Sequence, residues 1–182
     1  MSEYFLMRQS SGAIIEVSEK DESYLPFSDW ACVPTKPIRM YETFKPEGDY
    51  DVPECAEFPR VGLAKRVVLE AGLQYTYGVN WVPANLTNNK VNRDYFYINC
   101  MPEIKCVDLV NSEYSMVRPN GTIRGLEKLA LDDSLLSVIP LNHRLIFKMK
   151  ESARVLFHKS VVERIMATNP INTTFIPCEY FV

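Results

Sequence analysis

Histidine is scarce in this sequence: His143 and His158 are the two that occur in 182 residues. Neither belongs to a metal-binding motif, and no cysteine stands near either of them at ligand spacing. Glycine is scarce too, with seven residues, and no phosphate-binding loop, dinucleotide fingerprint or nucleophile elbow occurs. We therefore predict no metal, no cofactor and no catalytic residue. An enzyme whose site assembles from residues distant in the sequence stays open as an alternative.

Long apolar runs are also lacking, since no stretch approaches the roughly 20 residues of a membrane-spanning helix. The N-terminus carries an acid, Glu3, where a signal peptide has basic residues. The net charge of −3 argues against general binding to nucleic acid. Five scattered cysteines, an odd number, favour buried thiols in a reducing compartment; they are Cys32, Cys55, Cys100, Cys106 and Cys178. We expect a cytoplasmic protein that binds neither membrane nor nucleic acid.

The sequence is rich in the residues that build an ordered core, with 47% hydrophobic and 12% aromatic residues. Residues 94–112 contain two short aromatic and β-branched strands, and residues 4–8 and 13–17 are typical of a hairpin. Apolar residues at helical spacing predict two main amphipathic helices, at about 60–71 and 159–167. We predict an α+β fold with a mostly antiparallel or mixed sheet, as one domain over residues 1–182.

The two helical segments resemble each other. Residues 65–83 align without gaps on residues 159–177, with paired valines in each helix and an aromatic-aliphatic-proline end to each following strand. Two related helix–strand units would explain this match. The general likeness of any helix followed by a buried strand would explain it equally well.

The N-terminal part, residues 1–57, is acidic and rich in proline. Six acids lie between Glu42 and Glu57, against Lys45 alone, which gives this segment a local charge of −5. Such a run is typical of a solvated loop, and it also has the composition of a recognition loop in which an aromatic anchor lies among carboxylates. The candidate binding residues are Glu47, Asp49, Tyr50, Asp51 and Glu54. Calcium is not predicted, because the run lacks the spacing of a calcium loop.

Residues 58–182 resemble a family of bacterial immunity proteins from polymorphic toxin systems, including those of type VI secretion. The resemblance rests on strand and core patterns; these are Tyr97-Ile98-Asn99, Cys106-Val107-Asp108 followed by Ser112, Leu126 to Leu131, Ile146-Phe147-Lys148, Val155-Leu156 and Phe175-Ile176-Pro177. The family departs from this chain where the last helix begins, at His158-Lys159, and where it ends, at Asn169-Pro170.

The resemblance implies a small cytoplasmic antitoxin. Such a protein neutralises a cognate secreted toxin by tight, stoichiometric binding that covers the toxin's active site. It also implies that the sequence of residues 1–57 varies with the identity of the toxin. Besides the enzyme, a scaffold that assembles with itself through the exposed aromatics of residues 24–44 is a second alternative.

Overall fold

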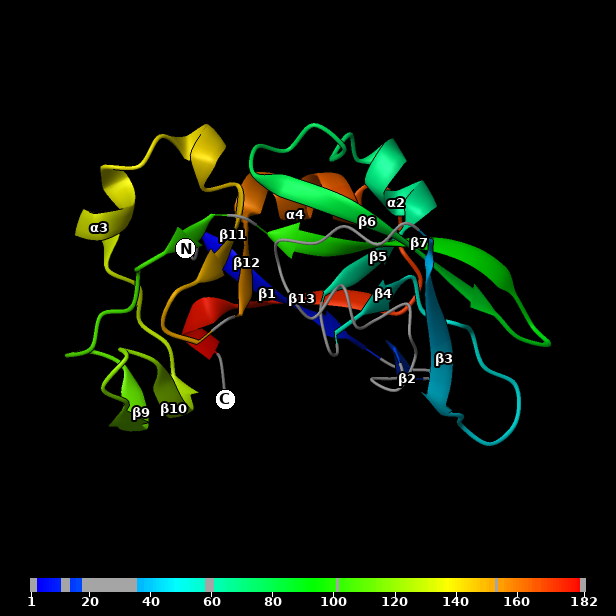
Figure 1. Cartoon of the computed structure of the whole chain (residues 1–182), viewed down its shortest axis with the longest axis horizontal. Helices are drawn as coiled ribbons and strands as arrows, with labels where there is room; N and C mark the ends of the chain where they lie inside the picture. The colour runs from blue at the N-terminus through cyan, green and yellow to red at the C-terminus, as the bar shows by residue number, and fades with distance from the viewer. Residues whose placement is uncertain are drawn as a thin grey trace.

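The computed structural model describes residues 3–10, 14–17, 36–57, 61–100, 102–152 and 154–180. These residues form a mixed α+β fold in which strands predominate (Figure 1). One sheet has five strands in the order β13-β1-β12-β11-β8. Their bounds are Tyr4–Gln9 for β1, Glu103–Ile104 for β8, Ile146–Met149 for β11, Val155–His158 for β12 and Thr173–Pro177 for β13.

A second sheet has six strands in the order β2-β3-β6-β7-β5-β4. Their bounds are Ile14–Val17 for β2, Ile38–Phe44 for β3, Cys55–Ala56 for β4, Gly62–Ala64 for β5, Val79–Thr87 for β6 and Asn92–Cys100 for β7. The pairs β3–β6 and β11–β8 are parallel, and the other strand pairs are antiparallel. The predicted mostly antiparallel, mixed sheet is thus confirmed, although it is divided into separate sheets.

A separate hairpin joins β9 (Glu113–Val117) to β10 (Ile123–Lys128), and three α-helices occur in the described residues: α2 (Lys65–Glu70), α3 (Asp133–Ser137) and α4 (Lys159–Met166). Two short 3-10 helices lie at Leu141–His143 and Cys178–Tyr180. The prediction of two main helices was therefore incomplete. Asp132 caps α3 by accepting hydrogen bonds from the N–H groups of Ser134 and Leu135. A helix of five residues has too little periodicity to be recognised in the sequence.

The first predicted helix begins later than expected. Residues 62–64 form β5, which pairs with β7, so that α2 starts only at Lys65. The side chain of Tyr97 lies directly over Gly62, since a Cβ built there would be 3.1 Å from the tyrosine ring. Glycine therefore permits this close strand pairing. Gly72, with a φ of 63°, follows the end of α2 in the left-handed conformation that commonly ends a helix at glycine.

The predicted hairpin of residues 4–8 and 13–17 is wrong. Strand β1 lies between β12 and β13 in the five-stranded sheet, and β2 pairs with β3 in the six-stranded sheet. Local alternation of apolar residues identifies a strand, but it does not say which strand is its partner. Residues 94–112 contain two strands as predicted, β7 and β8, and these lie in different sheets.

Two strand–helix–strand units have the same topology. In the first, the chain runs through β5, α2 and β6, and β7 lies between the two strands and is antiparallel to both. In the second, it runs through β12, α4 and β13, and β1 lies between the strands in the same way. The N-terminal strand β1 therefore completes a unit whose other elements come from the last thirty residues of the chain.

The register of the two units also agrees. In the first, Phe96 of β7 lies opposite both Leu63 and Pro83. In the second, Phe5 of β1 lies opposite both Phe157 and Pro177. The two sets of partners are 94 residues apart (157 − 63 and 177 − 83), which is the offset of the sequence match between 65–83 and 159–177. The match therefore reflects a shared strand register as well as a shared pattern.

The helices of the two units lie against each other and are linked at both ends. Arg66 of α2 donates a hydrogen bond to the carbonyl of Thr168, beyond the end of α4 (3.2 Å), and Arg164 of α4 donates one to the carbonyl of Gly72, beyond the end of α2 (3.5 Å). Val67 and Val68 of α2 are fully buried, as are Val161 and Ile165 of α4.

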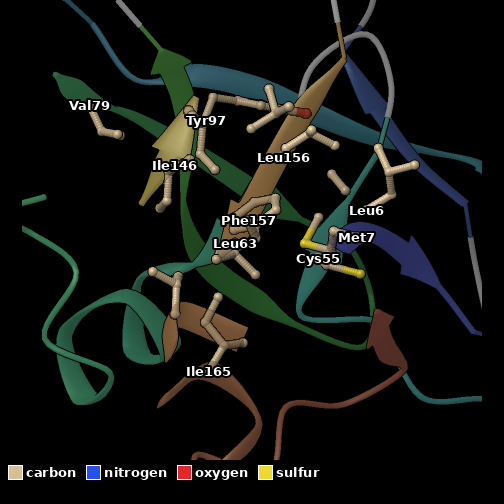
Figure 2. Close-up of a cluster of buried hydrophobic side chains, with 14 of the residues drawn as sticks. Leu6, Met7, Cys55, Leu63, Val79, Tyr97, Ile146, Leu156, Phe157 and Ile165 are labelled. Carbon is tan, nitrogen blue, oxygen red and sulfur yellow. The ribbon is translucent and has the colours of Figure 1, made fainter. Parts of the chain in front are cut away.

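One hydrophobic cluster unites the two large sheets (Figure 2). It contains Leu6 and Met7 of β1, Leu63 of β5, Tyr97 of β7, Phe157 of β12 and Ile165 of α4. Burial raises the pKa of Cys55 and of Cys178 to about 12 and raises that of the Cys106 thiol as well. These three are free, buried thiols, as predicted; Cys32 and the side chain of Cys100 lie outside the described residues. None of the described helices has the length and apolar character that a membrane crossing requires.

Candidate functional site

The predicted binding residues lie in two consecutive segments that follow β3. We call residues 45–49 the acidic loop and residues 50–54 the strap. The loop turns at Gly48, whose φ of 82° is a conformation that favours glycine. The carboxylates of Glu47, Asp49 and Asp51 are exposed. Three of the five predicted residues therefore present charge to solvent.

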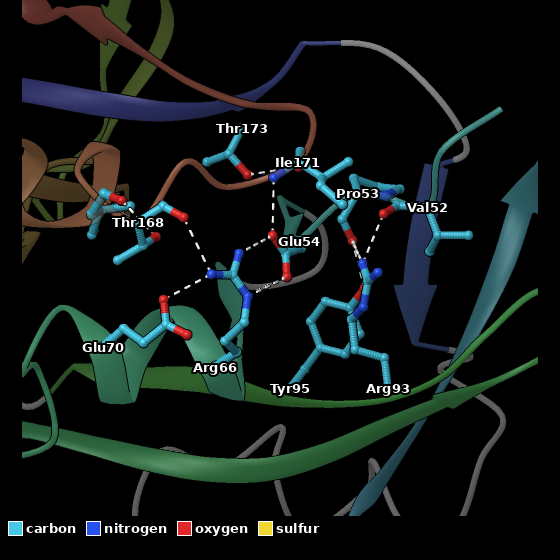
Figure 3. A network of polar contacts seen from close by, with 11 residues as sticks. Val52, Pro53, Glu54, Arg66, Glu70, Arg93, Tyr95, Thr168, Ile171 and Thr173 are labelled. Carbon is cyan, nitrogen blue, oxygen red and sulfur yellow. Dashed lines mark hydrogen bonds and ion pairs between the residues drawn. The ribbon is translucent and has the colours of Figure 1, made fainter.

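The strap is held to the rest of the protein by all of its backbone carbonyls. Figure 3 shows the bonds from Arg93 to the carbonyls of Val52 and Pro53. The donors come from residues 64–172: Lys90 Nζ to Tyr50 (3.1 Å), Asn172 Nδ2 to Asp51 (3.1 Å), Arg93 Nη1 to Val52 (2.8 Å) and Pro53 (3.3 Å), Tyr95 Oη to Pro53 (2.5 Å), and the Ala64 N–H to Glu54 (2.7 Å). Most of these donors are side chains, because residues 50–53 belong to no strand. A short irregular segment is thereby fixed at every residue.

Glu54 anchors the strap and is not a surface residue, with 4% of its area exposed. Its carboxylate accepts hydrogen bonds from Arg66 Nε (3.1 Å) and Nη2 (2.6 Å) and from the N–H of Ile171 (3.0 Å). Burial raises the pKa of Glu54, but the bonds from Arg66 and Ile171 lower it by more, so that the pKa lies below its usual range. Glu54 therefore joins the strap to α2 and to the segment before β13.

Tyr50 is half-buried and packs against the hydrophobic core. Its hydroxyl donates a hydrogen bond to Glu42 (3.1 Å), and the Nζ of Lys90 lies over its ring, 3.7 Å from the centroid. The tyrosine is thus a fixed part of the frame that carries the loop.

The local charge of this segment is smaller than its sequence indicates. Four of the six acids form ion pairs with bases; these are Glu42 with Lys45 (3.3 Å), Asp49 with Lys90 (2.9 Å), Glu54 with Arg66 (2.6 Å) and Glu57 with Arg8 (3.2 Å). The hydrogen bond from Lys90 lowers the pKa of Asp49. Glu47 and Asp51 have no ion pair within the described residues. Three of the four bases lie outside residues 42–57, so the net charge of −5 calculated for that segment does not include them.

Exposed apolar side chains lie just before the acidic loop. Phe44, the last residue of β3, is 54% exposed, and Ile14, its cross-strand partner on β2, is 43% exposed. Tyr41, on the same strand, is 43% exposed. Apolar side chains surrounded by charged ones are the composition of a protein–protein contact. The predicted aromatics at 24–35 lie outside the described residues.

Both histidines have structural contacts. His158 is the N-cap of α4, where its Nδ1 accepts a hydrogen bond from the N–H of Ser160 (3.2 Å), and burial lowers its pKa. A neutral ring at this position agrees with the positive end of the helix dipole. His143 stacks on Tyr77, with 4.0 Å between the ring centroids.

A cavity of about 710 Å³ lies between β1, α3 and the C-terminal 3-10 helix. Its polar lining residues are Glu3, Tyr4, Lys128, Asp133, Ser137, Arg144, Cys178 and Glu179, and neither histidine is among them. Arg144, at this cavity, bonds to the hydroxyl of the buried Tyr4 and to the carbonyl of Ile139 (3.0 Å). Within the described part of the chain no three His, Cys, Asp or Glu side chains gather in a way that could hold a metal ion.

No family model matches this chain, and no curated protein matches it significantly. The resemblance to immunity proteins is therefore a hypothesis from the sequence patterns alone.

The acidic loop could be predicted from the sequence, but the residues that hold the strap next to it could not; these are Arg66, Lys90, Arg93, Tyr95 and Asn172. No sequence signal identifies them, because they lie between 12 and 121 positions from the atoms they bind.

Proposed function

We propose that this chain is an immunity protein that neutralises a secreted antibacterial toxin in the cytoplasm of the cell that makes it. Neutralisation is by stoichiometric binding that covers the toxin's active site. The observation that carries the proposal is the acidic loop. It presents exposed carboxylates beside exposed apolar side chains, on a strap that is hydrogen-bonded to the scaffold at every residue.

This arrangement has the composition that tight binding requires, with exposed apolar side chains beside charged ones. A stable complex buries about 800 Å² on each partner, with a few central apolar anchors and a polar rim. Phe44 and Ile14 are the anchors in this proposal, and Glu47, Asp49 and Asp51 form the rim. Because ion pairs neutralise much of the local charge, this surface binds chiefly by its shape. The carboxylates of Glu47 in the loop and Asp51 in the strap, which have no ion pair within the described residues, set the register against cationic groups of the toxin.

The test is protection of a bacterium that expresses the secreted effector encoded beside this protein. The wild-type chain should restore growth and should form a 1:1 complex with the effector's toxic domain in light scattering. Substituting the exposed residues, as Phe44→Ala with Glu47→Ala and Asp51→Ala, should weaken the complex at least tenfold, since each lost anchor costs on the order of 1 kcal/mol.

A matched control removes exposed acids elsewhere, as Glu127→Ala with Asp133→Ala. It should leave protection intact. Failure of the wild-type chain to protect would refute the proposed function. Equal protection by the wild type and the loop variant would refute this surface while leaving the function standing.

A further inference from the structure

We propose that Arg93 and Arg66 are positioning residues for the partner-binding surface. They hold the strap so that the acidic loop has its binding conformation before the toxin arrives. This inference rests on the proposed function, because the toxin is the partner for which the loop is prepared.

The strap cannot be fixed by a β-ladder. Pro53 has no N–H to donate, and residues 50–53 pair with no strand. The carbonyls of residues 50–53 therefore depend on donors from side chains, whereas that of Glu54 binds the backbone N–H of Ala64. Arg93 binds the carbonyls of both Val52 and Pro53 from one nitrogen of its guanidinium, and Tyr95 adds a second bond to the carbonyl of Pro53. Val52 is 3% exposed, so its carbonyl lies in a protected position where a lost partner is not simply replaced by water.

Arg66 fixes the other end of the strap. Its guanidinium binds the Glu54 carboxylate at two nitrogens, and the third position binds Glu70 (2.8 Å) and the carbonyl of Thr168 (3.2 Å). One side chain thus ties the strap to α2 and to the end of α4. The planar guanidinium makes these bonds in fixed directions, which an ammonium group cannot do.

The acidic loop joins the strap directly at Tyr50, so the position of the strap sets that of the loop. If the strap were released, the loop would spend only part of its time in the conformation that binds. The apparent Kd rises as the inverse of that fraction, so a fall of the fraction to about one tenth weakens binding about tenfold. Most of this change should be slower association, because binding would then require a conformational step.

The experiment is amide hydrogen exchange of the full chain, read over residues 45–57, in the wild type and in Arg93→Gln. Exchange in these residues should become about tenfold faster in the variant, as a tenfold rise in local opening requires. Exchange in β7 and β12 should not change. Arg93→Lys should show an intermediate rate, since a lysine can reach one carbonyl.

The matched control is Arg144→Gln, which removes a guanidinium that binds a backbone carbonyl at the other end of the molecule. It should leave residues 45–57 unchanged. Two results would overturn the inference: unchanged exchange of residues 45–57 in Arg93→Gln, or an increase spread equally over the whole chain. The hydrogen-exchange experiment does not use the toxin, so its outcome does not depend on the proposed function. Failure of the proposed function would show instead as the absence of protection by the wild-type chain. With the toxic domain as the probe, Arg93→Gln should bind about tenfold more weakly.

Discussion

The strongest single prediction concerns the pair of Glu54 and Arg66. We consider three variants: Glu54→Gln, Arg66→Gln and the double substitution. Each single change leaves one group of the pair without its charged partner, whereas the double change removes both charges together. The free energies of unfolding of the four proteins then give the coupling energy of the pair without counting the other contacts of either side chain.

The structure sets the size of this coupling. Two hydrogen bonds join charged groups, and such bonds contribute roughly 1.5–3 kcal/mol each when both groups are buried. The Glu54 side chain is 5% exposed, but that of Arg66 is 43% exposed, so water screens part of the interaction. We therefore expect a coupling of about 2 kcal/mol rather than the full sum. Arg66→Gln alone should cost about 2–3 kcal/mol, because the carboxylate stays buried and loses its cation.

The assay is unfolding in urea at pH 7, monitored by circular dichroism. The m value, the slope of the free energy of unfolding against urea concentration, should be the same for the four proteins if they unfold in the same two-state transition. A single substitution that costs 2 kcal/mol should lower Tm by about 4–8 °C in a protein of this size. A coupling below about 0.5 kcal/mol would refute the argument. It would mean that the pair behaves like a surface salt bridge and does not anchor the strap.

Two further predictions concern titratable groups. The pKa of Glu54 in the folded protein lies below its ordinary value of about 4.3, so the unfolded chain binds the proton of this carboxyl more tightly than the folded chain does. The ionised Glu54 carboxylate therefore stabilises the fold above about pH 5. This stabilisation is lost as the pH falls through the lowered pKa. Urea midpoints between pH 3 and 7 should therefore fall more steeply for the wild type than for Glu54→Gln, and parallel curves would contradict this. His158→Ala should be less stable than His158→Asn by about 1 kcal/mol, because asparagine can still cap α4. Equal urea midpoints for these two variants would exclude a capping role.

Several features of the fold could be predicted because they depend on local patterns. The valines of α2 and α4 lie at helical spacing, and Gly72 ends its helix in the left-handed region that glycine favours. The match of residues 65–83 with 159–177 left two explanations open, and the shared strand register of the two units agrees with the explanation by related helix–strand units. The partner of β1 could not be predicted, since it lies about 150 residues away at β12 and about 170 away at β13.

The candidate site was predicted in part. Exposure of Glu47, Asp49 and Asp51 agrees with an acidic, proline-bounded segment that cannot form a helix. Glu54, in contrast, is buried, because it forms an ion pair with Arg66, which lies twelve residues away in another element. Counting charges along a segment misses such pairs, because ion pairs form between neighbours in space.

Local patterns in the sequence account for the fold class and several elements of this protein: an α+β chain with buried thiols, two valine-bearing helices and an acidic segment exposed after β3. Local steric preference and the burial of apolar side chains fix these features, and both act over a few neighbouring residues. Which acids remain exposed and which become anchors depends instead on tertiary packing. That choice depends on where Arg66, Lys90 and Arg93 come to lie, and their positions follow from the packing of two sheets and two helices around a shared core.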